Sequence, residues 1–369
     1  MNAPRRSTDP HAKGQVVLVL QGGGALGAYQ AGVYQALHEA GVEPDWVIGT
    51  SIGAINGALI AGNTAENRIA RLREFWRRVE QTTPFAMASI FMRGIESFFV
   101  PRTPAFGGVY AQVRLDAASY YSTEPLHETL GELVSLECLN AKRVRLTVGA
   151  VNVRSGSMRY FDSRDAVLML DHIMASGALP PAFPAIRIDG EPYWDGGVYS
   201  NTPIEAVLDD KPRRDSVIFS VNVWQPTGVE PQSIWQVMGR QKDIQYASRA
   251  DSHIARQKQI HRLRHVIREL AALLPPEARG TMRCRELETW GCGTTMHVVR
   301  LLAPTLDSED YLKDIDFTPA GIRARWQAGL ADTRRMIERA PWERDVDPME
   351  GVIVHELSAR TGMQVKEMV

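Results

Sequence analysis

The 369-residue sequence has few cysteines, no long apolar run and no excess of either charge. Its three cysteines are an odd number in a chain of this length, so we expect no disulfide framework and a reducing, cytoplasmic location. No run of about 18 apolar residues is present, which argues against a transmembrane helix. Residues 1–14 lack the apolar segment of a signal peptide. The 42 basic and 43 acidic residues nearly cancel, which argues against a nucleic-acid partner.

The spacing of potential metal ligands is also unfavourable. Cys284, Cys292 and His297 do not follow the close spacing of a zinc site. We therefore expect no metal, and no other cofactor is indicated.

Short apolar runs alternate with helix-like stretches in the first half of the chain. This alternation predicts parallel strands with helices packed on both faces of a sheet. Glycines after two of the helical stretches mark their ends. The predicted strands are 16–20, 46–48, 143–153, 157–161 and 217–223, and the predicted helices are 28–40, 52–61 and 66–79.

The character of the sequence changes after residue 223. Residues 231–274 are predicted to form one long helical stretch rich in arginine, followed by a strand at 296–302 and a helix at 319–339. Its basic side chains are scattered around the helix, so contact with an anionic membrane surface is not required. We expect a flexible tail (1–14), a catalytic domain (15–225) and a mainly helical extension (226–369).

Two glycine-framed turns near the start of the chain carry the clearest chemical signal. Gly22-Gly23-Gly24-Ala25-Leu26-Gly27 and Gly49-Thr50-Ser51-Ile52-Gly53 each follow a predicted strand and begin a helical stretch. Unpaired backbone N–H groups are available at such turns. The second turn has the form of a nucleophile elbow, in which the flanking Gly49 and Gly53 allow a sharp bend that exposes Ser51.

Ser51 is therefore the predicted nucleophile, and the first turn is predicted to hold the oxyanion. A serine hydroxyl needs a base to take its proton and donors for the oxyanion formed on attack. The amides of Gly22, Gly23, Gly24 and Ala25 are the candidate donors, and Gly27 supports the turn.

The candidate base is the carboxylate of Asp195 in Asp195-Gly196-Gly197. Two glycines after a carboxylate make a tight turn from which the side chain can reach the serine. Taken alone, the same triplet is more often an ordinary surface turn. The upstream segment 177–184 is either an apolar wall of the pocket or a plain connecting loop.

The segment 84–108 carries many apolar side chains between prolines. Base rates favour a helix and loop packed on the core. The alternative is a lid or an acyl-chain entrance over the serine.

In order and content, these motifs resemble the patatin-like phospholipase family over about residues 16–223. The resemblance implies a three-layer α/β/α fold, a Ser51–Asp195 dyad without histidine, and metal-independent hydrolysis of acyl esters, usually of lipids. Residues 175–184 and Asn201-Thr202-Pro203 also resemble the family. Many members carry Arg or Lys where this chain has Leu26, so a cationic contribution to phosphate or oxyanion binding is missing there. The expected partner is a lipid or other acyl ester, with peripheral membrane contact as an option.

Three other interpretations compete with this one. Gly22-x-Gly24-x-x-Gly27 also fits a dinucleotide-binding fingerprint, but the next strand ends in Gly49-Thr50-Ser51 instead of an acid for the ribose. A Ser-His-Asp esterase would use one of the histidines at 253, 261, 265 or 297. An inactive scaffold that binds a partner through its C-terminal helices is the third.

Overall fold

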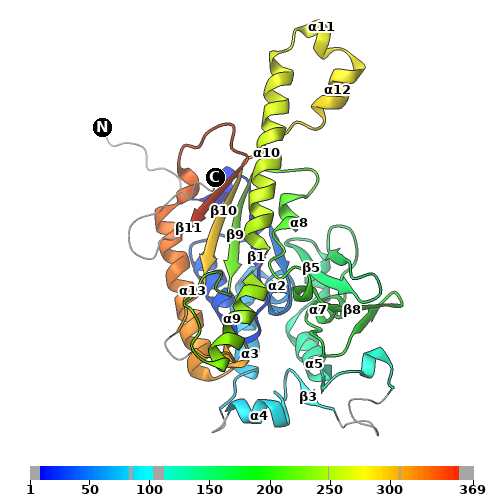
Figure 1. Cartoon of the computed structure of the whole chain (residues 1–369), viewed down its shortest axis with the longest axis vertical. Coiled ribbons are helices and arrows are strands. Elements are labelled where there is room, and N and C mark those ends of the chain that lie inside the picture. The colour runs from blue at the N-terminus through cyan, green and yellow to red at the C-terminus, as the bar shows by residue number, and fades with distance from the viewer. Residues whose placement is uncertain (1–8, 83–85, 103–111, 248, 307–308, 357–369) are drawn as a thin grey trace.

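The sheet at the centre of the molecule has helices on both of its faces (Figure 1). The computed structural model describes residues 9–82, 86–102, 112–247, 249–306 and 309–356, apart from the side chains of 86–89. Nine strands of this part of the chain form the main sheet. The predicted α/β/α architecture with a mostly parallel sheet is confirmed.

The strand order is β11-β10-β9-β1-β2-β5-β8-β7, with β6 on the second edge of β5. The strands from β11 to β5 run parallel, whereas β6 and β8 are antiparallel to β5, and β7 is antiparallel to β8. The bounds are β1 Gln15–Leu20, β2 Trp46–Gly49, β5 Arg145–Asn152, β6 Met158–Asp162, β7 Ile186–Ile188, β8 Glu191–Asp195, β9 Ser216–Asn222, β10 Met296–Leu302 and β11 Val352–Glu356. A separate ribbon pairs β3 Val100–Pro101 with β4 Tyr121–Ser122.

The three helices predicted at 28–40, 52–61 and 66–79 are present as α1, α2 and α3, and the predicted strand 296–302 and helix 319–339 are β10 and α13, whereas α5 to α8 were not predicted. The bounds are α1 Ala28–Glu39, α2 Ile52–Ala61, α3 Ala65–Arg78, α4 Ala86–Arg93, α5 Glu124–Leu133, α6 Leu136–Asn140, α7 Leu170–Ser176, α8 Glu205–Leu208, α9 Ile234–Ala247, α10 Ala250–Leu273, α11 Pro276–Arg279, α12 Met282–Glu288 and α13 Pro319–Arg339. Residues Pro10–Lys13 of the expected tail form a short 3-10 helix.

The single long helix predicted over 231–274 is wrong, because α9 and α10 are separate helices. The chain turns between them at Arg249, whose φ of 79° lies in the left-handed region. No glycine or proline marks this turn, so it could not be predicted from the residues around it. Figure 1 shows α10 continuing past the sheet, with α11 and α12 at its far end.

The side chains of β1 alternate between two hydrophobic cores, as expected for a strand covered on both faces. Val16, Leu18 and Leu20 pack into the larger core, which includes residues of α1, α2 and α13. Val17 and Val19 pack into the second core with residues of α8, α10 and β10. Both faces of the sheet are thus buried at the C-terminal end of β1, where the first glycine loop begins.

The C-terminal helix α13 packs directly against α1 through two glycines. A Cβ at Gly32 would lie 1.9 Å from the carbonyl oxygen of Trp326, and one at Gly329 would lie 2.1 Å from that of Tyr29. The indole N–H of Trp326 also donates to Gln35 at 2.7 Å. The region after residue 225 therefore completes the main sheet with β10 and β11 and covers one of its faces with α13.

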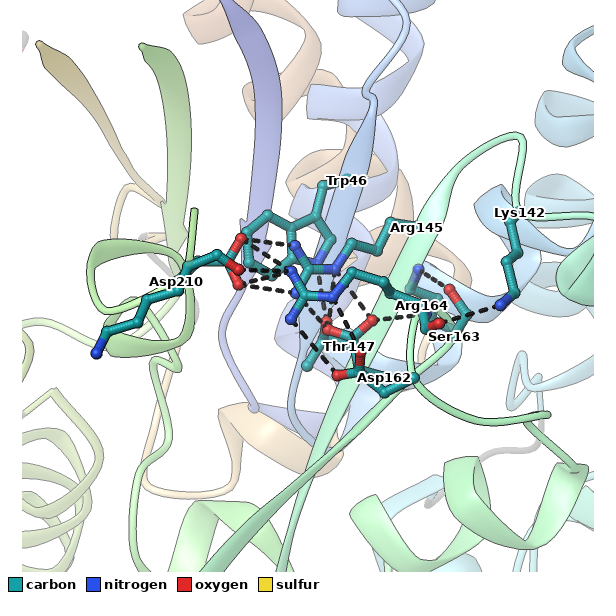
Figure 2. Close-up of polar contacts among 11 residues, drawn as sticks. Trp46, Lys142, Arg145, Thr147, Asp162, Ser163, Arg164 and Asp210 are labelled. Carbon is teal, nitrogen blue, oxygen red and sulfur yellow. Dashed lines mark hydrogen bonds and ion pairs between the residues drawn. The ribbon is translucent and has the colours of Figure 1, made fainter. Parts of the chain in front are cut away.

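A network of charged side chains fastens the amino ends of β2 and β5 (Figure 2). The Arg145 guanidinium lies 3.5 Å from the Trp46 ring centroid. It bridges Asp162 at 2.7 Å and Asp210 at 2.9 Å. Arg164 also reaches Asp210, at 2.9 Å. The network joins three strands to the loop that precedes β9.

We expect Arg145→Ala to lower the free energy of unfolding by about 3 kcal/mol, because Asp162 would lose its ion pair in a largely buried place and Asp210 would keep only its pair with the more exposed Arg164. Urea unfolding at neutral pH measures this. Arg154→Ala is the control, because the Arg154–Glu191 ion pair is exposed and should contribute less than about 1 kcal/mol. Equal losses in the two variants would contradict the prediction.

Candidate active site

The strands β2 and β8 meet end to end on one edge of β5. On this edge Gly49, the last residue of β2, pairs with Val148, while Asp195, the last residue of β8, pairs with Ala150. The strand β6 pairs with the opposite edge of β5 over the same residues. Both β2 and β8 must therefore pair with the edge that β6 leaves free. Since β2 is parallel to β5 and β8 is antiparallel, their carboxyl ends point toward each other. The structure thus brings Ser51 and Asp195 together.

Ser51 is held in a strained backbone conformation at the start of α2. Its φ of 57° and ψ of −126° are unusual for a residue with a side chain. The turn is close-packed, because a Cβ at Gly49 would lie 2.3 Å from the Gly53 carbonyl oxygen. A Cβ at Gly53 would lie 2.2 Å from that of Leu20. The Ser51 amide donates to the Ser176 carbonyl oxygen at 3.0 Å, which holds the elbow to the end of α7.

Asp195 is a buried carboxyl group that shares a cavity wall with Ser51. Only 1% of the residue is exposed. The Gly197 amide donates to its Oδ1 at 2.7 Å. Burial raises the pKa of the Asp195 carboxyl to about 7, and the nearby Gly197 amide and Ser51 hydroxyl offset only part of this rise. Gly196 is required for close packing, because a Cβ there would lie 2.4 Å from the Gly149 carbonyl oxygen.

The first glycine loop passes directly beside the serine. A Cβ at Gly22 would lie 3.0 Å from the Ser51 Cβ and 2.3 Å from Asn201 Oδ1, so only glycine fits. The Gly22 amide donates to the Asn201 carbonyl oxygen at 3.1 Å. Gly23 and Gly24 line the same pocket as Ser51, and Gly27 packs on Ile52.

Leu26 and Ala25 are buried in the larger core behind the first loop. The Leu26 side chain borders a separate small cavity, not the one that contains Ser51. At this position the chain therefore contributes packing and no charge to the site.

The residues just outside the predicted motifs hold the first loop in place. The buried side chain of Gln21 accepts from the amides of Val223 and Trp224 at 2.6 and 3.1 Å and donates to Thr202 at 2.7 Å. The Asn201 side chain donates to the Gly22 carbonyl oxygen at 3.0 Å. Asn201-Thr202-Pro203 stood out in the sequence, but nothing in the pattern marked Gln21 or Trp224.

Ser51 and Asp195 open into a cavity of about 200 Å³ whose walls are mostly apolar. Four of its aromatic residues form one cluster, in which the Phe99 ring lies 4.9 Å from Tyr121 and 5.2 Å from Phe183. The segment 177–184 forms part of the wall, as one of its two interpretations predicts. Other apolar lining residues are Ile52, Ile55, Ile90, Phe91, Phe98, Leu126, Leu179, Ala182, Ile315 and Phe317.

The described part of the segment 84–108 also borders this cavity. Ile90, Phe91, Phe98 and Phe99 line it, while Phe85 and Phe106 lie outside the described residues and the Met87 side chain is not described. The segment thus contributes a wall of the pocket.

None of the nine histidines, all of which are described, lines the cavity. His253 contacts Glu205 at 3.2 Å, and His261 contacts the Leu208 carbonyl oxygen at 3.3 Å. His265 lies between two backbone carbonyls, and His297 stacks on His355 in the neighbouring strand. The histidines proposed for a triad therefore have other contacts.

Comparison with known proteins identifies two matching family models. The model described as patatin-like phospholipase matches residues 18–208, just over half of the chain. A second, described as patatin phospholipase, matches residues 244–349. None of the described helices has the length and apolarity needed to cross a bilayer.

Similar proteins include a lysophospholipase nte1 of Aspergillus terreus, 42% identical over 96 residues, which are 23% of this chain and 6% of the relative. Patatin-like phospholipase domain-containing protein 6 of Homo sapiens is 46% identical over 63 residues, 17% of this chain and 5% of the relative. A lysophospholipase NTE1 of Candida glabrata is 27% identical over 224 residues, 57% of this chain and 10% of the relative. The chain thus matches a tenth or less of the length of these relatives. Among solved structures, VipD from Legionella pneumophila aligns at 15% identity with a TM-score of 0.39, over 89% of this chain and 67% of that one.

The raised pKa of Asp195 has a consequence for stability. Between pH 4 and 7 the folded protein holds a proton on this carboxyl group that the unfolded chain releases, so the free energy of unfolding falls as the pH rises through this range. We expect Asp195→Asn to remove this dependence and to be more stable than the parent at pH 8, by on the order of 3 kcal/mol. Urea unfolding at pH 5 and pH 8 measures this.

The control is Asp171→Asn, which changes an exposed carboxylate in the same way. Its effect on stability should be small at both pH values. If Asp195→Asn were no more stable than the parent at pH 8, burial of the ionised Asp195 carboxylate would not lower the free energy of unfolding as expected.

Proposed function

The chain belongs to the patatin-like phospholipase family, and we propose from this premise that it hydrolyses lipid acyl esters with Ser51 as nucleophile and Asp195 as general base. The observation that carries the proposal is the placement of Ser51 beside the buried Asp195 carboxyl group in the wall of one apolar cavity. A carboxylate with an ordinary pKa is a poor base toward a hydroxyl. The raised pKa of Asp195 makes its carboxylate a stronger base.

In the proposed reaction, Asp195 accepts the proton of Ser51 as the serine oxygen attacks the ester carbonyl carbon. The negative charge that develops on the carbonyl oxygen is stabilised by amides of the first loop. Because the Gly22 amide is engaged with Asn201, the amides of Gly23, Gly24 and Ala25 are the better donors. The positive end of the α2 dipole adds roughly 0.3 to 1 kcal/mol of stabilisation for negative charge beside Ser51.

The alcohol leaves with the proton held by Asp195, and an acyl group remains on Ser51. As water attacks the acyl-enzyme carbonyl it gives a proton to Asp195, and Asp195 returns that proton to the Ser51 oxygen when the bond to the acyl group breaks and the fatty acid is released. Every proton in this sequence is accounted for by one carboxyl group, so no histidine is needed.

The acyl chain of the substrate is proposed to lie in the aromatic part of the cavity, against Phe98, Phe99, Tyr121 and Phe183. Apolar walls suit a hydrocarbon chain, whereas only a few polar groups near Ser51 remain for the ester and the alcohol. Leu26 adds no cation for a phosphate. A lysophospholipid, as the names of the relatives indicate, or another single-chain ester fits this arrangement.

We expect Ser51→Ala and Asp195→Asn each to lower kcat for p-nitrophenyl butyrate by about a thousandfold or more, because each removes a group on which both chemical steps depend. Stopped assays with purified protein measure this. In the parent protein kcat/KM should rise with pH and level off above about pH 7, since the carboxylate is the active form.

The matched controls are His253→Gln and His265→Gln, which change histidines that contact protein groups away from the cavity. Both variants should keep most of the activity. An inactive histidine variant together with an active Asp195→Asn variant would favour a Ser-His-Asp triad over the Ser51–Asp195 dyad.

The acyl-chain position predicts a change of specificity. Phe99→Ala should enlarge the cavity and raise the ratio of turnover of p-nitrophenyl laurate to butyrate by about tenfold, because the longer chain gains the space of the ring. Phe161→Ala is the control, because Phe161 is buried to the same extent and packs on Tyr193 but does not line the cavity. An equal change of this turnover ratio in both variants would mean that the acyl chain does not lie against Phe99.

A further inference from the structure

The helix α9 directs its charged side chains toward the protein. Lys242 forms an ion pair with Asp314 at 2.7 Å, and Asp243 accepts from Lys313 at 2.8 Å. Arg240 donates to two backbone carbonyls at 2.9 and 2.7 Å. All three charged residues of the helix are therefore engaged with the body of the molecule.

The opposite face of α9 is apolar and exposed. Ile234 is 78% exposed, Val237 51%, Met238 39% and Ile244 53%. At helical spacing these four residues share one face with the exposed Gln241 and Gln245. None of these six side chains carries a charge. A surface helix normally has the reverse arrangement, with its apolar face on the core.

Both α9 and α4 border the acyl cavity. Tyr246, near the C-terminal end of α9, lines the cavity, and so does Phe91 of α4. Phe91 is 55% exposed and the adjacent Met92 79%. Figure 1 shows α4 and α9 toward the end of the molecule to which the parallel strands point, whereas α11 and α12 lie at the opposite end.

We propose that the exposed face of α9, together with Phe91 and Met92 of α4, inserts into the surface of a lipid bilayer and delivers the ester to Ser51. The inference rests on the proposed function and names the partner of the same site. Apolar helix faces enter the boundary between headgroups and acyl chains when they are exposed in this way. Here both helices border the apolar cavity, which would receive an acyl chain from the bilayer.

The lack of charge on this face specifies the kind of surface. Binding through apolar burial does not require anionic lipid and changes little with salt, whereas binding through the arginines of α10 would require anionic lipid and weaken as salt increases. We therefore expect the protein to bind neutral, zwitterionic bilayers.

The test is flotation of the full chain with phosphatidylcholine vesicles at 0.05 and 0.5 M salt, with Ser51→Ala protein so that the lipid is not consumed. We expect binding at both salt concentrations, and a loss of about tenfold or more when Ile234→Gln and Ile244→Gln are combined. Leu263→Gln with Leu270→Gln is the matched control, because these leucines form a stripe on α10 and are 63% and 58% exposed. The control should bind normally.

A second measurement uses substitutions that preserve an aromatic ring. Trp235 on α9 and Trp290 after α12 are 57% and 67% exposed. Brominated phosphatidylcholine should quench part of the tryptophan fluorescence of the parent. This quenching should fall in Trp235→Phe and persist in Trp290→Phe.

Several outcomes would overturn the proposal. They are binding only to anionic vesicles, an equal loss in the α10 control, or quenching that depends on Trp290. Turnover of soluble p-nitrophenyl butyrate by the α9 variant with Ser51 intact should match the parent. A failure of vesicle binding with this turnover intact would refute the docking surface alone, whereas absence of turnover in the parent would refute the proposed function.

Discussion

The site depends on the meeting of two strand ends on a single edge of β5. A parallel strand ends at Gly49 and an antiparallel strand ends at Asp195, two residues further along the same neighbour. Residues that are far apart in the sequence are thus fixed by backbone hydrogen bonds instead of flexible side chains. Such placement on rigid elements is what the proposed dyad would need, because a small displacement of either group would spoil the geometry for proton transfer between them.

The same arrangement explains why the carboxyl group is an unusual one. It is enclosed by close-packed backbone on the Gly149 side and by the apolar cavity on the other, so its charge is poorly solvated. A site that stabilises the neutral acid at rest makes the carboxylate more basic, at the expense of fold stability. The strained backbone of Ser51 is a second local cost in the same place. The sheet, which is buried on both faces, and the packing of α1 against α13 provide stability that offsets the burial of Asp195 and the strain at Ser51.

Much of this could be predicted from the sequence, since the relevant signals are local. Periodicity located β1, α2, β10 and α13 to within a residue, and the glycine patterns marked both loops. Other features depend on contacts between distant segments. Nothing near β8 indicated that it runs antiparallel into the end of β2, and the break at Arg249 carries no glycine or proline. The short strand β11 was not predicted, and the supporting role of Gln21 arises only from its contacts with Val223 and Trp224.

The position of β10 has a consequence for how the chain can be divided. All seven residues of β9 are buried, and β10 pairs with it along its whole length. A fragment that stopped near residue 225 would expose a long, flat and apolar sheet edge, which is a template for pairing with other chains and for aggregation. The α1 surface around Gly32 would be uncovered as well. The last two fifths of the chain thus cover the edge of the main sheet, and a shortened protein would need a redesigned edge to remain monodisperse.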